Sequence, residues 1–104
     1  MIDRLKQLEA IARSQPNNPF ALYSLAMEKK KTDLAGALAV FEQIRASHPS
    51  YVPNYYQYAK ALETSGEEER ARAVYREGIE AAQSAGDLHA EGELRAALEL
   101  LSDA

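Results

Sequence analysis

The stretch YVPNYYQYAKAL, residues 51–62, holds four of the six tyrosines of this 104-residue chain and indicates how the chain folds. Tyr55, Tyr58 and Leu62 follow one another at spacings of three and four residues, which places them on one face of a helix. Tyr56 lies one residue and about 100° further round the helix, so it faces another direction. We predict that Tyr55 and Tyr58, and further along the chain Tyr75, pack in a core and that Tyr56 reaches a different surface.

The same pattern occurs earlier in the chain. A shift of 33 residues pairs Leu8 with Phe41, Ile11 with Ile44, Pro16 with Pro49, Leu22 with Tyr55, Leu25 with Tyr58 and Ala26 with Ala59. Past the next turn, a shift of 34 residues pairs Ala37 with Ala71 and Phe41 with Tyr75. Self-similarity at a period near 34, with two helical segments in each period, indicates a helical solenoid. The hairpins of a solenoid stack because no single hairpin can bury its own apolar face.

Proline and glycine divide the chain into segments with helical apolar spacing. Good helix formers dominate these segments and nothing alternates like a strand, so we predict six amphipathic helices of about 12 to 18 residues. The apolar stripe of the first helix comprises Leu5, Leu8, Ile11 and Ala12. Asp33 is predicted to cap the start of a helix, and Gly66 and Gly86 suit the left-handed residue that ends one.

The period and these residues resemble the tetratricopeptide repeat. The family pattern has a large apolar residue, a leucine and a small residue on the first helix, then alanine, an aromatic, a small residue and a closing proline on the second. The matching residues are Leu22, Leu25, Ala26, Ala37, Phe41 and Pro49, then Tyr55, Tyr58, Ala59, Leu62, Ala71, Tyr75 and Gly78. Gln83 replaces the second closing proline, so the fifth helix is expected to run to Ala85. Gly78 also differs in size from its counterpart Ile44, at a position where two helices cross.

The resemblance implies an all-α fold. It is a right-handed superhelical stack of antiparallel helix hairpins, an α-solenoid of about six helices, in a single domain over residues 1–104. Residues 1–18 would form a half repeat, 19–51 the first repeat, 52–85 the second repeat and 86–104 a C-terminal capping helix.

The resemblance also implies where a partner would bind, because in the family the first helix of each hairpin lines a concave groove. By repeat position, the partner-binding residues would be Phe20, Tyr23, Met27, Lys30, Lys31, Tyr56, Gln57, Lys60 and Glu63. Three lysines against one glutamate make this set mildly basic, so we expect a peptide segment with an apolar or aromatic anchor flanked by acidic residues. Tyr23 and Met27 replace the lysine and asparagine clamp by which some members hold a C-terminal carboxylate. The alternative for Tyr56 is half-buried packing between repeats without a ligand.

Composition and motifs argue against several other classes of function. The net charge of −4, from 16 acidic and 12 basic residues, argues against a nucleic-acid binder. No apolar run approaches the roughly 18 residues of a membrane span, and the first residues lack the apolar region of a secretory signal. There are no cysteines, His48 and His89 stand alone, and no catalytic or phosphate-binding motif occurs. We therefore predict a cytoplasmic scaffold that binds a protein or peptide, with no enzymatic activity, cofactor, metal, nucleic acid or membrane.

The alternative function is structural: a homodimer formed through terminal helix surfaces. In the last helix, Leu100 lies off the main apolar stripe and Leu88 is displaced from it. End helices of solenoids have an outer face that needs shielding. Light scattering distinguishes the two functions, because a chain that stays monomeric at high micromolar concentration cannot be a homodimer subunit.

Overall fold

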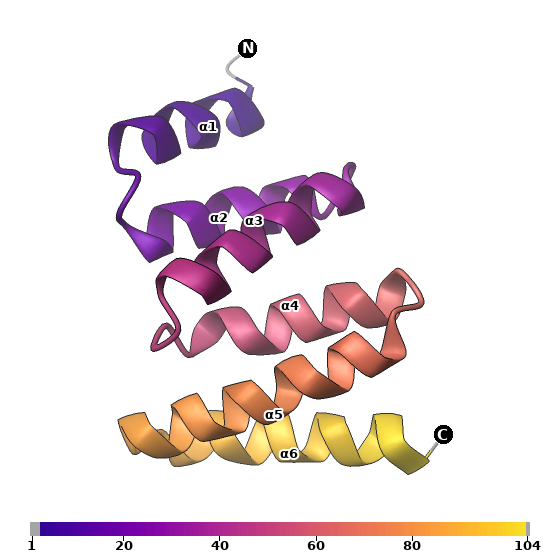
Figure 1. Cartoon of the computed structure of the whole chain (residues 1–104). Coiled ribbons are helices and arrows are strands. Elements are labelled where there is room, and N and C mark those ends of the chain that lie inside the picture. The colour runs from indigo at the N-terminus through magenta and orange to yellow at the C-terminus, as the bar shows by residue number, and fades with distance from the viewer. Residues whose placement is uncertain (1–2, 104) are drawn as a thin grey trace. The chain divides into compact units, whose positions relative to one another are not determined.

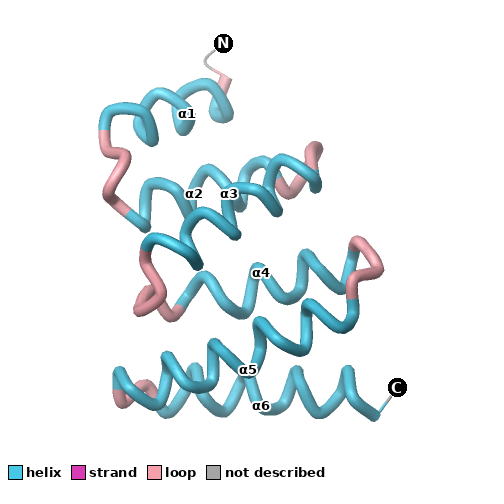
Figure 2. Tube along the Cα trace, viewed as in Figure 1, coloured by secondary structure: helices cyan, strands magenta, loops and turns pink. Residues whose placement is uncertain are grey.

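The computed structural model describes residues 3–103, and these residues form six helices and no strand (Figures 1 and 2). The helices are α1 (Arg4–Ser14), α2 (Pro19–Lys29), α3 (Leu34–Ser47), α4 (Pro53–Thr64), α5 (Glu68–Ala85) and α6 (Leu88–Asp103). The predicted all-α class is confirmed. Two helices, α1 and α2, have 11 residues each and are slightly shorter than expected.

The chain forms two compact units, of which the first ends at His48 and the second begins at Pro49. The first unit holds α1, α2 and α3, and α2 packs against both of its neighbours. The second unit holds α4, α5 and α6, and α5 packs against both α4 and α6. In each unit, therefore, the middle helix is covered on two sides by the helices before and after it.

Local side chains and glycines set the ends of the helices, largely as predicted. The Asp33 carboxylate accepts a hydrogen bond of 2.9 Å from the Gly36 amide at the start of α3. Gly66 and Gly86 have positive φ angles of 82° and 69°, which favour glycine because it has no Cβ. Helix α5 does run to Ala85, as expected from the glutamine in place of a closing proline.

The core of the second unit contains three tyrosines, as predicted. Tyr55, Tyr58 and Tyr75 are at most 3% exposed. Two of their hydroxyls reach groups near the edges of the core, since buried polar atoms need partners. The Tyr55 hydroxyl donates to the Pro49 carbonyl at 2.5 Å, and the Tyr58 hydroxyl accepts from the Arg70 guanidinium at 2.7 Å. The buried hydroxyl of Tyr75 donates to Glu63, one of the predicted partner-binding residues.

One predicted core residue of the first unit is wrong. Leu8 and Ala12 are buried, but Ile11 on the same stripe is 43% exposed. The reason is geometric, because Ile11 lies about 60° from Leu8 and about 100° from Ala12 around the helix. Within its unit α1 packs only against α2. A single neighbouring helix covers a strip narrower than the apolar stripe of α1.

Candidate protein-binding surface

The partner-binding residues predicted from the sequence fall into two sets, one on each unit. The α2 set comprises Phe20, Tyr23 and Met27 within α2, Lys30 at its C-cap, and Lys31 in the following turn. The α4 set comprises Tyr56, Gln57, Lys60 and Glu63, all within α4. Every member is at least partly exposed. Each set is therefore exposed on the surface of its own unit, where a partner could contact it.

Three members of the α4 set converge with a residue of α5. The Lys60 ammonium lies 5.6 Å from the centroid of the Tyr56 ring and 3.6 Å from a carboxylate oxygen of Glu63. The Tyr75 hydroxyl, from α5, donates to the same Glu63 oxygen. The Tyr56 and Tyr75 rings meet edge to face, with centroids 6.4 Å apart and planes inclined by 68°. We call Tyr56, Lys60, Glu63 and Tyr75 the α4 cluster.

Tyr75 holds the Glu63 carboxylate in place from the buried side of the α4 cluster. Burial, together with the hydrogen bond and the negative charge of Glu63, raises the pKa of the Tyr75 phenol far above its ordinary value. The phenol therefore remains a hydrogen-bond donor at every physiological pH. Glu63 is held by Tyr75 on the buried side and by Lys60 on the exposed side, so its charge has a defined place at the surface.

The sequence prediction missed this supporting role of Tyr75, which was assigned only to the core. A signal was present in the repeat alignment. The first repeat has Phe41 and Lys30 at the positions where the second has Tyr75 and Glu63. Phenylalanine has no hydroxyl, and lysine cannot accept a hydrogen bond. The two positions differ together, as expected if they are in contact in one repeat only.

The α2 set has an acidic neighbour, Glu28, which is not among the binding residues predicted from the sequence. Glu28 lies 2.9 Å from Lys31 and 3.6 Å from Arg4. The Glu28 side chain is only 20% exposed, whereas those of its two cationic partners are 67% exposed. Lys31 and Lys60 thus each form an ion pair with a carboxylate. The excess of positive charge on these surfaces is therefore smaller than the predicted residues alone indicate.

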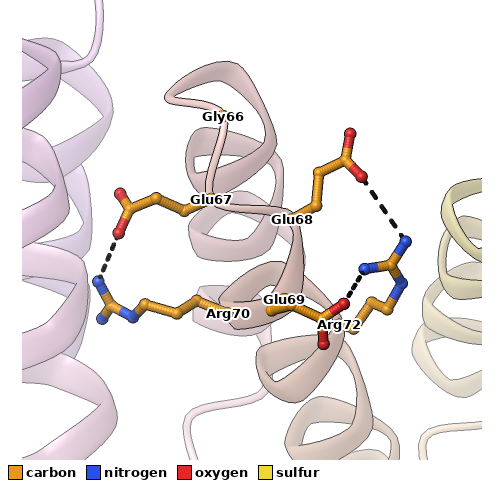
Figure 3. A pocket seen from close by; sticks show the side chains of 6 residues that line it. All are labelled: Gly66, Glu67, Glu68, Glu69, Arg70 and Arg72. Atoms are coloured by element: carbon orange, nitrogen blue, oxygen red, sulfur yellow. Dashed lines mark hydrogen bonds and ion pairs between the residues drawn. The ribbon is translucent and has the colours of Figure 1, made fainter.

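A second charged site lies at the start of α5, but its charges satisfy one another. This shallow pocket of about 460 Å³ is lined by Gly66, Glu67, Glu68, Glu69, Arg70 and Arg72 (Figure 3). Arg70 pairs with Glu67 at 3.1 Å, and Arg72 pairs with Glu69 at 2.6 Å and Glu68 at 3.6 Å. Hydrogen bonds from Ser65 and then Arg70 lower the pKa of Glu67. The arrangement is that of a solvated first turn stabilised by ion pairs.

Within residues 3–103, no three His, Cys, Asp or Glu side chains are grouped so that they could hold a metal ion. None of the six helices combines the length and the apolar character needed to cross a bilayer.

Comparison with known proteins connects this architecture to a family. The family model of the tetratricopeptide repeat matches residues 30–90. Two solved structures of a tetratricopeptide repeat domain protein from Salinibacter ruber are similar to the chain. The solution structure is 36% identical, with a TM-score of 0.79, over 83% of this chain and 88% of that one. The crystal structure is 34% identical, with a TM-score of 0.78, over 82% of this chain and 97% of that one.

A third structure, of a protein from Bordetella parapertussis, is 25% identical with a TM-score of 0.82 and covers 99% of this chain and 90% of that one. The search of curated proteins gives no match. The family match spans more than half of the chain, and the Salinibacter structures cover most of it at over 30% identity. The all-α helical-repeat fold predicted from the 34-residue period is confirmed, and this chain belongs to the tetratricopeptide-repeat family.

Proposed function

We propose that this chain is a non-enzymatic interaction module that binds a peptide segment or helix of a partner protein, with the α2 set of one unit and the α4 set of the other as candidate binding surfaces. Tetratricopeptide-repeat folds generally mediate protein–protein interaction, through the extended surfaces that stacked hairpins create. The α4 cluster is the part of the chain that best supports the proposal. It combines an accessible aromatic ring with two opposite charges in a small area.

The observation that carries the proposal is that the residues of the α4 cluster contact one another within the chain, which restricts their side chains before any ligand arrives. Tyr75 and Lys60 hold Glu63, while Tyr75 and Lys60 also contact the Tyr56 ring. Ordering a flexible side chain on binding costs about 0.5–1.5 kcal/mol, so a surface that is already ordered loses less on binding. Tyrosine suits such a contact because its ring is apolar and its hydroxyl is polar.

The charges of the two sets restrict the chemistry of the ligand. For the α4 set we propose an apolar or aromatic anchor that packs on Tyr56, flanked by an acidic residue that approaches Lys60. On the α2 set, an acidic residue of a partner would approach Lys31. Those acids would compete with Glu63 and Glu28, which already lie 3.6 Å and 2.9 Å from the two lysines. The acidic residues would therefore add less binding free energy than they would opposite unpaired lysines. A larger share of the binding free energy would come from the aromatic anchor.

Capture of partners from a lysate of the source organism tests the proposal. We would compare the wild-type chain with a Tyr56→Ala, Lys60→Ala variant and with a Tyr23→Ala, Met27→Ala variant. Glu80→Ala is the matched control, since Glu80 is exposed on α5 and lies five residues, about 140°, from Tyr75 around that helix. Circular dichroism and urea unfolding establish that each variant is folded.

A partner that the wild type and the control capture, and that the α4 variant loses, would support the proposal. If the α2 variant also loses it, both sets contribute to the same interaction. A partner retained by both variants would overturn the proposal and move the binding site to another face. Because Tyr56 contacts Tyr75, Lys60→Ala alone serves as the test if the double variant is unfolded.

A further inference from the structure

The two opposite charges of the α4 cluster attract each other but do not form a hydrogen bond. The Lys60 ammonium lies 3.6 Å from Glu63 Oε2, which is within ion-pair distance and beyond hydrogen-bond distance. In the pair beside the α2 set, by contrast, Lys31 donates to Glu28 at 2.9 Å. The side chains of Lys60 and Glu63 are only 38% and 27% exposed. Both charges are therefore partly withdrawn from water, while hydrogen-bonding capacity remains on each.

That capacity is a donor on one side chain and an acceptor on the other. The Lys60 ammonium carries three N–H donors, and within residues 3–103 it has no acceptor at hydrogen-bond distance. Glu63 uses the same oxygen, Oε2, for Tyr75 and for Lys60. Its other oxygen, Oε1, accepts no hydrogen bond from the described part of the chain. A ligand at the α4 cluster thus meets an N–H donor and a carboxylate acceptor on neighbouring side chains.

The chemistry of this pair selects a neutral ligand group with an acceptor and a donor on adjacent atoms. A carboxylate has acceptors only and is repelled by Glu63, whereas an ammonium or guanidinium has donors only and is repelled by Lys60. A hydroxyl must make both bonds through one oxygen. The primary carboxamide of asparagine or glutamine has a carbonyl oxygen and an amino group on one edge and carries no charge. It can accept from Lys60 and donate to Glu63 without separating the two residues.

The neighbouring ring places this group in the ligand. The Lys60 ammonium lies 5.6 Å from the centroid of the Tyr56 ring, so an aromatic anchor that packs on Tyr56 brings its adjacent residue to the charged pair. We propose that the α4 cluster recognises a primary carboxamide, the side chain of an asparagine or glutamine beside the aromatic anchor. Its oxygen accepts from Lys60, and its amino group donates to Glu63 Oε1.

This inference rests on the proposed function, because it names the group that the α4 set binds. An acidic residue elsewhere in the ligand can still approach Lys60, since the ammonium retains further donors after it binds the carboxamide oxygen. The carboxamide differs from that acid in one respect. It satisfies Lys60 and Glu63 together, whereas the acid competes with Glu63 for Lys60.

Small probes measure this preference directly. Hydrocinnamamide joins a phenyl ring to a primary carboxamide through a short ethylene link, and hydrocinnamate has a carboxylate in the same place. The N,N-dimethylamide keeps the carbonyl and lacks the N–H donors. We expect hydrocinnamamide to bind with a dissociation constant of about 1–20 mM, as suits a fragment that touches few side chains. Hydrocinnamate and the dimethylamide should each bind at least about threefold more weakly, because a polar group left without its partner loses affinity.

Backbone-amide NMR spectra of the isotope-labelled chain provide the readout during titration. The signals of Tyr56, Lys60 and Glu63 should move together and saturate with hydrocinnamamide. The variant test uses a Tyr75→Phe background, in which Glu63 can be replaced without leaving a buried hydroxyl unpaired. Tyr75→Phe should keep the preference for the primary carboxamide over the dimethylamide, and Glu63→Ala in that background should abolish it. Glu80→Ala, which is exposed on α5, should bind all probes as the wild type does.

Several results would overturn the carboxamide assignment. They are the absence of any shift at these signals, equal affinity for hydrocinnamamide and the dimethylamide, tighter binding of hydrocinnamate, and a preference that survives Glu63→Ala in the Tyr75→Phe chain. An N-methylamide probe separates a side-chain carboxamide from a main-chain amide, because its N–H points away from its carbonyl as in a trans peptide bond. If it binds as tightly as hydrocinnamamide, a main-chain amide serves equally well and the assignment to asparagine or glutamine is wrong.

Failure of this inference is distinguishable from failure of the proposed function, because the capture experiment does not depend on the probes. A partner that the Tyr56→Ala, Lys60→Ala variant loses supports the proposed function whichever probe binds most tightly. If that partner is found and the dimethylamide binds as tightly as hydrocinnamamide, only the carboxamide assignment is overturned. If both capture variants retain the partner, the proposed function is overturned, and with it the ligand assignment that rests on it.

Discussion

The contact between α4 and α5 at Gly78 allows a sharp test of how closely the helices of the second unit pack. A Cβ at this position would lie 2.6 Å from the Cβ and 3.0 Å from the Cγ of Tyr55, and 3.2 Å from Leu94 Cδ1. Carbon atoms in contact prefer about 3.5–4.0 Å. The closest of these atoms is attached directly to the α4 backbone, so a rotamer change cannot relieve the overlap. Gly78→Ala would force the two helices apart.

Two opposing terms set the magnitude of this effect. Alanine is favoured over glycine in a helix interior by about 1 kcal/mol. Overpacking of a well-packed core costs about 1–3 kcal/mol, and an overlap with a backbone-attached atom belongs near the upper limit. We therefore expect Gly78→Ala to lower the free energy of unfolding by about 2 kcal/mol, the difference between the two terms. The equivalent residue of the first repeat is Ile44.

Gly92→Ala is the matched control, because Gly92 is also inside a helix and a Cβ there meets nothing within 4 Å. It should raise the free energy of unfolding by about 0.5–1 kcal/mol through helix propensity alone. Urea denaturation followed by circular dichroism measures both values, with the slope of each transition compared to the wild type. If Gly78→Ala is as stable as Gly92→Ala, then α4 and α5 do not approach each other closely at Tyr55, and the reasoning is refuted.

Three further predictions concern the surfaces. Tyr75→Phe, which installs the residue found at Phe41, should lower the free energy of unfolding by about 1–2 kcal/mol in urea denaturation, because it removes a hydrogen bond to the charged Glu63. The pKa of Tyr75 is higher in the folded chain than its ordinary value of 10.0, so the stability contributed by the neutral phenol is complete below pH 10 and declines above it. Thermal unfolding from pH 8 to 11 should show a shallower alkaline decline for Tyr75→Phe than for the wild type; equal slopes would contradict the raised pKa. A peptide with an aromatic anchor and acidic flanks should bind more weakly as salt rises, and an affinity unchanged by salt in fluorescence titrations would exclude a role for Lys31 and Lys60.

The candidate surface could be predicted only in part, and the reason differs from residue to residue. The positions of Tyr56 and Lys60 on α4 follow from helical spacing, because residues four apart lie on the same face. The contact between Glu63 and Tyr75 joins residues 12 apart on two helices. It depends on how α4 and α5 slide and rotate against each other, and spacing along one helix does not contain that information. That these residues bind a partner is a prediction, which the capture experiment tests.

The sequence by itself determined the family, the number and class of the helices, the helix ends at Asp33, Gly66 and Gly86, and the burial of Tyr55, Tyr58 and Tyr75. These features are local or periodic. A cap is made by residues a few positions apart, and a core face repeats every three to four residues whatever lies opposite.

Only the tertiary structure decided which apolar positions are covered and which polar groups meet. Ile11 lies on the predicted stripe but is exposed, because within its unit a single neighbour covers α1. Arg4 of α1 pairs with Glu28 of α2, and Tyr75 of α5 holds Glu63 of α4, because side chains on facing helices converge in space. Gly78 fits against Tyr55 because two backbones approach closely at one crossing. Such contacts depend on the distance and angle between helices, which side-chain packing sets after the helices have formed.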